Sequence, residues 1–156
     1  MRSITLCAFV LAAALPQAPA FAAKPAPANS ITAEGLAVGG YDPVAYFQDG
    51  KPVQGTRRYQ LSFQGAVWRF SSAENLKAFL DRPTAYAPQF GGYCAWAVSQ
   101  HYLAPGDPQQ WKIVDGKLYL NANARAKQLW EADQADAITR GHSNWPAVLS
   151  DNQSNR

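Results

Sequence analysis

The chain is short of the residues that bind metals and form disulfides. Its 156 residues include two cysteines, one methionine and two histidines. One of the cysteines, Cys7, lies in the apolar N-terminal segment, so the rest of the chain cannot close an internal disulfide. This scarcity excludes a disulfide-rich scaffold and a Cys-x-x-Cys oxidoreductase. A closed zinc site is also excluded, because such a site takes four protein ligands.

Charge is sparse and evenly spread. The chain has 14 Lys and Arg against 11 Asp and Glu, with a formal net charge of +3 and no run of like charge. That imbalance is too mild for a nucleic-acid or anionic-membrane partner. The carboxylates suggest no acid–base pair, and Gly91-Gly92 lacks the Lys and Ser/Thr of a phosphate-binding loop. The sequence therefore leans away from an enzyme, and no internal repeat is visible in it.

Long hydrophobic runs are absent as well. The longest, residues 4–15 after Arg2, has the length of a signal-peptide core and is too short to span a bilayer. Ala20-Phe21-Ala22 has the small-x-small pattern that signal peptidase cleaves. We therefore predict a signal peptide over residues 1–22, export to the periplasm or outside the cell, and no membrane insertion after cleavage.

Composition divides the remaining chain into three parts. Residues 23–36 are rich in Pro and Ala and predict a flexible leader. Residues 37–149 have the length of one domain, enough to bury a core without disulfides. Residues 150–156 are polar and predict a disordered tail.

Hydrophobic periodicity predicts two β-hairpins within that domain. The first covers residues 57–70 and turns at Gln64-Gly65, and the second covers residues 111–120 and turns at Asp115-Gly116. A helix over 71–81 separates them. It has a Ser71-x-x-Glu74 capping box and ends before Pro83, and its expected apolar face consists of Ala73, Leu76, Phe79 and Leu80.

Two C-terminal helices complete the prediction. One covers about 122–133 with Asn121 as its cap, and the other covers 134–140 and ends at Gly141. The expected fold class is α+β: a small antiparallel sheet from two hairpins, a central helix and one or two C-terminal helices. Trp68, Trp111 and Trp130 have core-like spacing.

The candidate site is residues 89–100, around the one cysteine that the mature protein would keep. Gly91-Gly92 precedes Cys94 and allows close backbone approach, while Tyr93 and Trp96 flank it. Tyr93, Cys94 and Trp96 are therefore the candidate ligand-binding residues. His101 follows seven residues after Cys94.

Three functions are compatible with this stretch. Cys94 and His101 are candidate ligands for a copper-type metal ion, although a third ligand is needed and His142 is the only other histidine. Alternatively, Cys94 is a redox or catalytic thiol with His101 as its base. The third alternative is an interaction domain in which Cys94 is buried and structural, as free cysteines often are.

The order of these motifs resembles the YHS domain. The resemblance is carried by Asp42-Pro43-Val44, the hairpin with Gly65, the segment from Trp68 to Ser72, and then Phe79, Pro83 and Tyr86. Gly39-Gly40-Tyr41 and Gly91-Gly92-Tyr93-Cys94-Ala95 are similar to segments of exported, single-domain bacterial YHS proteins.

The resemblance implies an association with metal binding through three cysteines. The corresponding places here hold Ala45, Ser71 and Asn75, none of which supplies a thiolate. The family's metal site therefore does not carry over to this chain. Cys94, which lies outside those places, is the cysteine left for a ligand.

Overall fold

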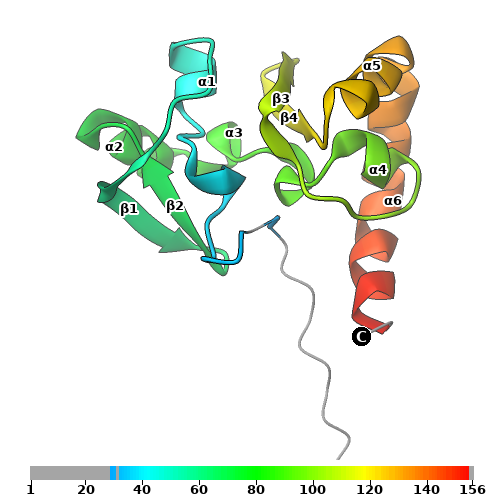
Figure 1. Cartoon of the computed structure of the whole chain (residues 1–156), viewed down its shortest axis with the longest axis horizontal. Coiled ribbons are helices and arrows are strands. Elements are labelled where there is room, and N and C mark those ends of the chain that lie inside the picture. Colours follow the sequence, from blue (N-terminus) through cyan, green and yellow to red (C-terminus); the bar gives the residue numbers. More distant parts are fainter. Residues whose placement is uncertain (1–28, 31, 155–156) are drawn as a thin grey trace, which may run out of the picture.

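Two lobes lie side by side in the computed structural model, which describes residues 29–30 and 32–154 (Figure 1). Residues 1–22, the predicted signal peptide, lie outside the described part. The first lobe contains α1 (Ala45–Gln48), β1 (Thr56–Phe63), β2 (Ala66–Phe70), α2 (Ala73–Asp81) and α3 (Pro83–Tyr86). The second contains α4 (Ala95–Ser99), β3 (Asp107–Val114), β4 (Lys117–Asn121), α5 (Ala124–Ala132) and α6 (Gln134–Ser154). Short 3₁₀ turns, η1 (Val38–Gly40) and η2 (Gln89–Gly92), precede α1 and α4.

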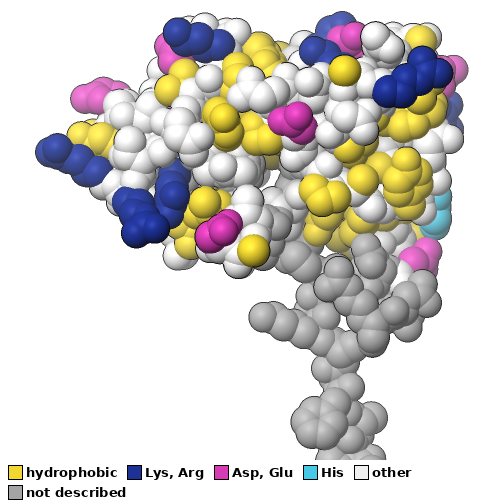
Figure 2. All heavy atoms as spheres, in the orientation of Figure 1, with side chains coloured by type: hydrophobic (Ala, Val, Ile, Leu, Met, Phe, Trp, Pro, Cys, Tyr) yellow, Lys and Arg dark blue, Asp and Glu magenta, His cyan; other side chains and the backbone are white. Residues whose placement is uncertain are grey.

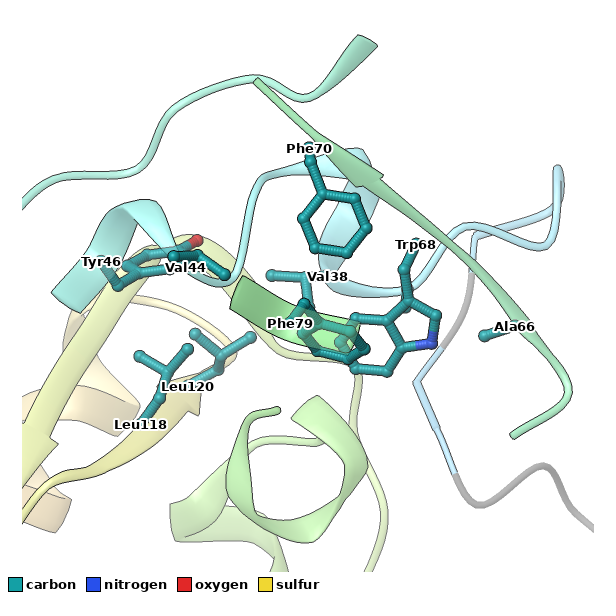
Figure 3. Packing of buried hydrophobic residues seen from close by; sticks show 10 residues of the cluster. Val38, Val44, Tyr46, Ala66, Trp68, Phe70, Phe79, Leu118 and Leu120 are labelled. Atoms are coloured by element: carbon teal, nitrogen blue, oxygen red, sulfur yellow. The ribbon is translucent and has the colours of Figure 1, made fainter. Parts of the chain in front are cut away.

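The α+β class and both predicted hairpins are confirmed. Each hairpin forms its own two-stranded antiparallel sheet, β1 with β2 and β3 with β4, rather than a share of one sheet. The hairpins meet through side chains instead of strand edges. Leu118 and Leu120 of β4 join Trp68 and Phe70 of β2 in one buried cluster (Figure 3).

The two lobes repeat one structural unit, a repeat that the sequence had not revealed. Each strand of the second hairpin begins 51 residues after its counterpart, and α5 begins 51 residues after α2. The registers agree in detail: Thr56 pairs with Phe70 and Gln60 with Arg69 across an irregularity, as Asp107 pairs with Asn121 and Trp111 with Leu120. Because register and element length depend on many residues at once, this agreement indicates a duplicated unit.

Turns and caps of the two units also correspond. Val38-Gly39-Gly40 and Phe90-Gly91-Gly92 both run through three consecutive positive φ angles, 52°, 58° and 82° against 53°, 58° and 79°. Ser72 accepts a hydrogen bond from the Asn75 N–H at the start of α2, as Asn123 does from the Ala126 N–H at the start of α5.

Buried rings occupy equivalent places beneath the paired helices. Phe79 of α2 lies against Trp68 of β2 at 5.0 Å and 34°, and Trp130 of α5 lies against Tyr119 of β4 at 5.2 Å and 38°. The predicted core positions of Phe79, Trp68 and Trp130 are therefore correct. Trp111 is only partly buried, and it contacts Tyr46 edge-on across the boundary between the lobes.

Several predicted local details were wrong because tertiary contacts override local patterns. Ser72, not Ser71, caps α2, and Asn123, not Asn121, caps α5. Ser71 and Asn121 make other hydrogen bonds instead: the Ser71 hydroxyl donates to Asp42, and Asn121 Oδ1 accepts from the Trp96 N–H. Leu80 is 61% exposed, so α2 buries a narrower face than its periodicity suggested.

The C-terminal helix is longer than expected. α6 continues through Gly141 and Pro146 to Ser154, and so takes in part of the predicted tail. Gly141 does not end the helix. A Cβ there would lie 2.7 Å from the Phe90 ring, so glycine allows α6 to pack against η2. Among the described residues, no helix combines the length and apolarity needed to cross a bilayer.

Part of the predicted leader lies against the domain. The Asn29 side chain donates to the carbonyl of Gln64, the Ser30 N–H donates to the carbonyl of Gly91, and Leu36 bridges to Val67. On the face drawn in Figure 2, basic, acidic and apolar side chains are interspersed, in line with the absence of like-charge runs in the sequence.

Candidate functional site

Cys94 lies at the start of α4 in the second lobe, with 1% of its surface exposed. Its Sγ accepts a hydrogen bond from the Ala97 N–H at 3.4 Å. The thiol donates in turn to Asn121 Oδ1 at 3.7 Å. Small side chains form the walls of this site: Ala97, Ala104, Ala122 and Ala126 pack around the sulfur together with Trp96.

Asn121 is the residue of this site that sequence reasoning missed. It ends β4 with no surface exposed, and its Oδ1 accepts from the Trp96 N–H at 3.1 Å as well as from the thiol. Its Nδ2 is buried and has no hydrogen-bond partner. Buried polar groups are normally paired, so an orphaned amide beside a thiol calls for an explanation. The sequence offered only a helix-cap signal at this position.

His101 does not join Cys94. It follows α4 at the end opposite the thiol, and its Nε2 lies 3.1 Å from Asp151 Oδ2 of α6 in an exposed pair. Among the residues that the structure describes, no group of three His, Cys, Asp or Glu side chains could hold a metal ion. The geometry therefore offers no ready metal centre at Cys94.

The predicted ligand-binding aromatics both pack against the buried cluster that includes Phe90 and Tyr119, and Trp96 also reaches the thiol site. Tyr93 packs against Trp145 of α6, with ring centroids 6.0 Å apart. Trp96 packs on the wall of the thiol site. The remaining histidine, His142, packs on Phe90 at 5.0 Å, and burial, followed by the charge of Lys117, lowers its pKa.

The first lobe contains a polar cluster centred on Asp42, whose side chain is completely buried. Its Oδ1 accepts from the N–H groups of Val44 at 2.9 Å and Ala45 at 3.4 Å. Its Oδ2 accepts from the Ser71 N–H at 2.8 Å, the Ser71 hydroxyl at 2.7 Å and Asn75 Nδ2 at 2.7 Å. Five donors thus surround one buried carboxylate, and charge-assisted bonds of this kind are the strong ones.

The model of the YHS domain matches residues 44–90. The chain carries a YHS domain. No curated protein and no solved structure gave a significant match. The matched YHS domain covers most of the first lobe and ends at Phe90, so Cys94 and the second lobe lie beyond it.

The metal that a YHS domain implies does not fit the residues found in this one. Ala45 has no ligating side-chain atom, and both Ser71 Oγ and Asn75 Nδ2 donate to Asp42. An amide nitrogen that donates a proton cannot also coordinate a cation. The Asp42 carboxylate already accepts hydrogen bonds from five donors, so it is not available to bind a metal ion in this cluster.

The repeat makes the two clusters equivalent. Cys94 stands where Asp42 stands, immediately after the Gly-Gly-Tyr turn, and Ala97 stands where Ala45 does. Ala122 and Ala126 replace Ser71 and Asn75, and Asn121 replaces Phe70. Even one contact is preserved: the Ala45 N–H lies 3.4 Å from Asp42 Oδ1, and the Ala97 N–H lies 3.4 Å from Cys94 Sγ.

Proposed function

We propose that the protein is an exported thiol-dependent redox protein in which Cys94 reacts with a small hydroperoxide. The observation that carries this proposal is the position of the sulfur. Cys94 occupies the place that holds a buried carboxylate in the first lobe, and the Ala97 N–H points at it. The thiolate is the nucleophilic form of cysteine, so the proposal requires the thiol, which donates to Asn121 Oδ1 in this structure, to give up its proton before it reacts.

The reaction balances with a peroxide as oxidant. The thiolate attacks one peroxide oxygen, an S–O bond forms and the O–O bond breaks. The departing oxygen takes up a proton, so that hydrogen peroxide gives water and Cys94 becomes a sulfenic acid. An external thiol then attacks the sulfur and releases water, and a second external thiol reduces the mixed disulfide and restores Cys94.

Burial limits the substrate. Because only 1% of Cys94 is exposed, the oxidant has to be close to water in size, and the external thiol has to wait for local opening near α4. His101 supplies no base in this scheme, since its ring pairs with Asp151 at the far end of α4.

Trapping of the sulfenic acid tests the proposal. Folded protein, treated with stoichiometric hydrogen peroxide in the presence of dimedone, should gain one adduct at Cys94. Cys94→Ser should gain none, and His101→Ala should react like the parent. If the folded parent gives no adduct while urea-unfolded parent does, the thiol is inert by burial and Cys94 has a structural role.

Copper binding is the second candidate, favoured by the presence of a YHS domain, since this domain is associated with metal handling. The sequence predicted Cys94 and His101 as ligands, and that prediction remains to be tested. Calorimetric titration of Cu(I) under reducing conditions separates the two candidates. Binding that both Cys94→Ser and His101→Ala weaken would favour copper, whereas dimedone trapping without Cu(I) binding favours redox chemistry.

Export also remains a prediction, and the redox proposal benefits from it because exported proteins meet oxidising conditions. N-terminal sequencing of the protein recovered from outside the cytoplasm should begin near Ala23. A recovered protein that still begins at Met1 would contradict the predicted cleavage.

A further inference from the structure

We infer that hydrogen bonds to Asp42 take the place of a metal ion in the YHS domain of this chain. The first lobe then folds without a metal and binds none at the places held by Ala45, Ser71 and Asn75. Cys94 takes no part in this arrangement, which is therefore independent of the proposed redox function. Two features of the molecule carry the inference: the donors around Asp42, and the alanines at the equivalent places of the second lobe.

The Asp42 carboxylate has no lone pair left for a cation. An ionised carboxylate offers about four lone-pair directions on its two oxygens. The N–H groups of Val44 and Ala45 lie 2.9 and 3.4 Å from Oδ1. The Ser71 N–H, the Ser71 hydroxyl and Asn75 Nδ2 lie 2.8, 2.7 and 2.7 Å from Oδ2. A metal ion could reach either oxygen only by displacing one of these donors, most of which are at the short distances of charge-assisted bonds.

The groups around the carboxylate also have the wrong polarity for a metal ion. A cation needs lone pairs directed at it, whereas Ser71 Oγ and Asn75 Nδ2 both direct hydrogens at Asp42 Oδ2. Asn75 Nδ2 lies 3.3 Å from Ser71 Oγ as well, which fixes its side of the amide. Turning that amide would set Oδ1 against the carboxylate, acceptor against acceptor. At the third place, Ala45 offers only a methyl group and a donating N–H. The cluster is therefore polarised in the opposite sense to a metal site.

These hydrogen bonds join separate segments of the first lobe, which is the task of a structural metal ion. Asp42 precedes α1, Ser71 follows β2, and Asn75 lies in the first turn of α2. Ser71 and Asn75 are 29 and 33 residues from Asp42 along the chain. Asp42 is fully buried and Asn75 is 6% exposed, and hydrogen bonds gain strength in such an interior. The lobe thus has an internal connection that needs no added ion.

The second lobe shows another way for the repeated unit to do without a metal at these places. Ala97, Ala122 and Ala126 occupy them there, and an alanine side chain has no atom that could ligate a cation. The three alanines pack with Cys94 and Trp96 instead. One copy of the unit therefore fills these places with donors around a carboxylate, and the other fills them with apolar contacts.

Melting of the full chain with and without metal ions tests the inference. Cys94→Ser is the reference protein, because it removes the candidate copper ligand of the second lobe. EDTA together with a Cu(I) chelator should leave its melting temperature unchanged, and neither Zn²⁺ nor Cu(I) should raise it. In this background, Ser71→Ala and Asn75→Ala supply the residue that the second lobe has at each place. Each should lower the melting temperature by about 5 °C or more, equally with and without chelators. Ser62→Ala, on the exposed side of β1, is the control and should melt like the reference.

Two results would overturn the inference. If chelators lower the melting temperature of the reference protein, or a metal ion raises it, and Asn75→Ala abolishes the effect, then the cluster binds a metal. If Asn75→Ala does not fold, Ser71→Ala replaces it in that comparison. If Ser71→Ala and Asn75→Ala both melt like Ser62→Ala, the hydrogen bonds do not hold the lobe together. Neither result bears on the peroxide reaction, which dimedone trapping with Cys94 intact decides separately.

Discussion

The buried carboxylate of Asp42 offers the sharpest test of how the first lobe is held together. Asp42→Asn keeps the shape of the side chain but removes the charge and turns one oxygen into a donor. If the amide nitrogen takes the Oδ2 position, it faces the Ser71 N–H, the Ser71 hydroxyl and Asn75 Nδ2, all of which donate. The hydroxyl can rotate and Asn75 Nδ2 keeps its bond to Ser71 Oγ at 3.3 Å, but the Ser71 N–H and the Asn75 side-chain N–H that point at Oδ2 lose that acceptor.

The magnitude follows from those two orphaned donors. A buried donor without an acceptor costs about 1–3 kcal/mol, so the pair costs about 2–6 kcal/mol. Against a total stability of about 5–15 kcal/mol, that is a large loss. If the amide turns the other way, its nitrogen faces the N–H groups of Val44 and Ala45 instead, and two donors are again orphaned.

Urea unfolding, followed by tryptophan fluorescence, measures the loss. Asp115→Asn is the matched control, because Asp115 is exposed in the β3–β4 turn and Asn-Gly suits that turn equally well. We expect a much lower midpoint for Asp42→Asn and an unchanged midpoint for the control, with similar slopes for both. If Asp42→Asn is as stable as the control, the five-donor account of the first lobe is wrong.

Three further predictions follow from other parts of the structure. Phe79→Ala should cost about 3–5 kcal/mol in urea, because the ring is 1% exposed between Trp68, Phe70 and Phe63; a variant as stable as the parent would contradict the core assignment. Ser72→Ala should cost about 1 kcal/mol through the lost α2 cap, as should Asn123→Ala for α5; unequal effects in the same assay would argue against their equivalence. The folded-state pKa of His142 is lowered below its usual 6.5, so the unfolded chain binds more protons and stability should fall as pH drops through 6.5. Melting temperatures from pH 8 to 5 should fall less for His142→Gln than for the parent, and parallel curves would rule out this contribution.

Local sequence patterns predicted those elements that depend on local physics. Gln64-Gly65 and Asp115-Gly116 form positive-φ hairpin turns, because glycine and Asp adopt that conformation at low cost. The periodicity of residues 71–81 predicted a helix with Phe79 on its buried side. These features depend on neighbours in the chain, so they could be inferred without knowing the fold.

The candidate site was predicted only in part. Cys94, which the sequence singled out, is a buried free cysteine among the described residues, and its role as a site stays a prediction. His101, chosen for its closeness in sequence, lies at the far end of α4 against Asp151. Asn121, the true neighbour of the thiol, is 27 residues away and reaches it through the register of β4. Contacts over such a separation leave no signal in a local pattern.

The sequence by itself determined the two hairpins, the helices between and after them, and the position of the one central thiol. The tertiary structure alone revealed that the hairpins and their helices form one unit built twice. The few identical residues in the two units are mainly at tight backbone positions. A Cβ on Gly55 would lie 2.6 Å from that of Arg69, and one on Gly106 would lie 2.8 Å from that of Leu120. Elsewhere many combinations of side chains can fill the same space. The two units therefore share their strand register and their buried positions although most of their residues differ. For the same reason only the folded chain could show that Cys94 and Asp42 occupy equivalent positions in the two units, and that the Asp42 side chain accepts five hydrogen bonds.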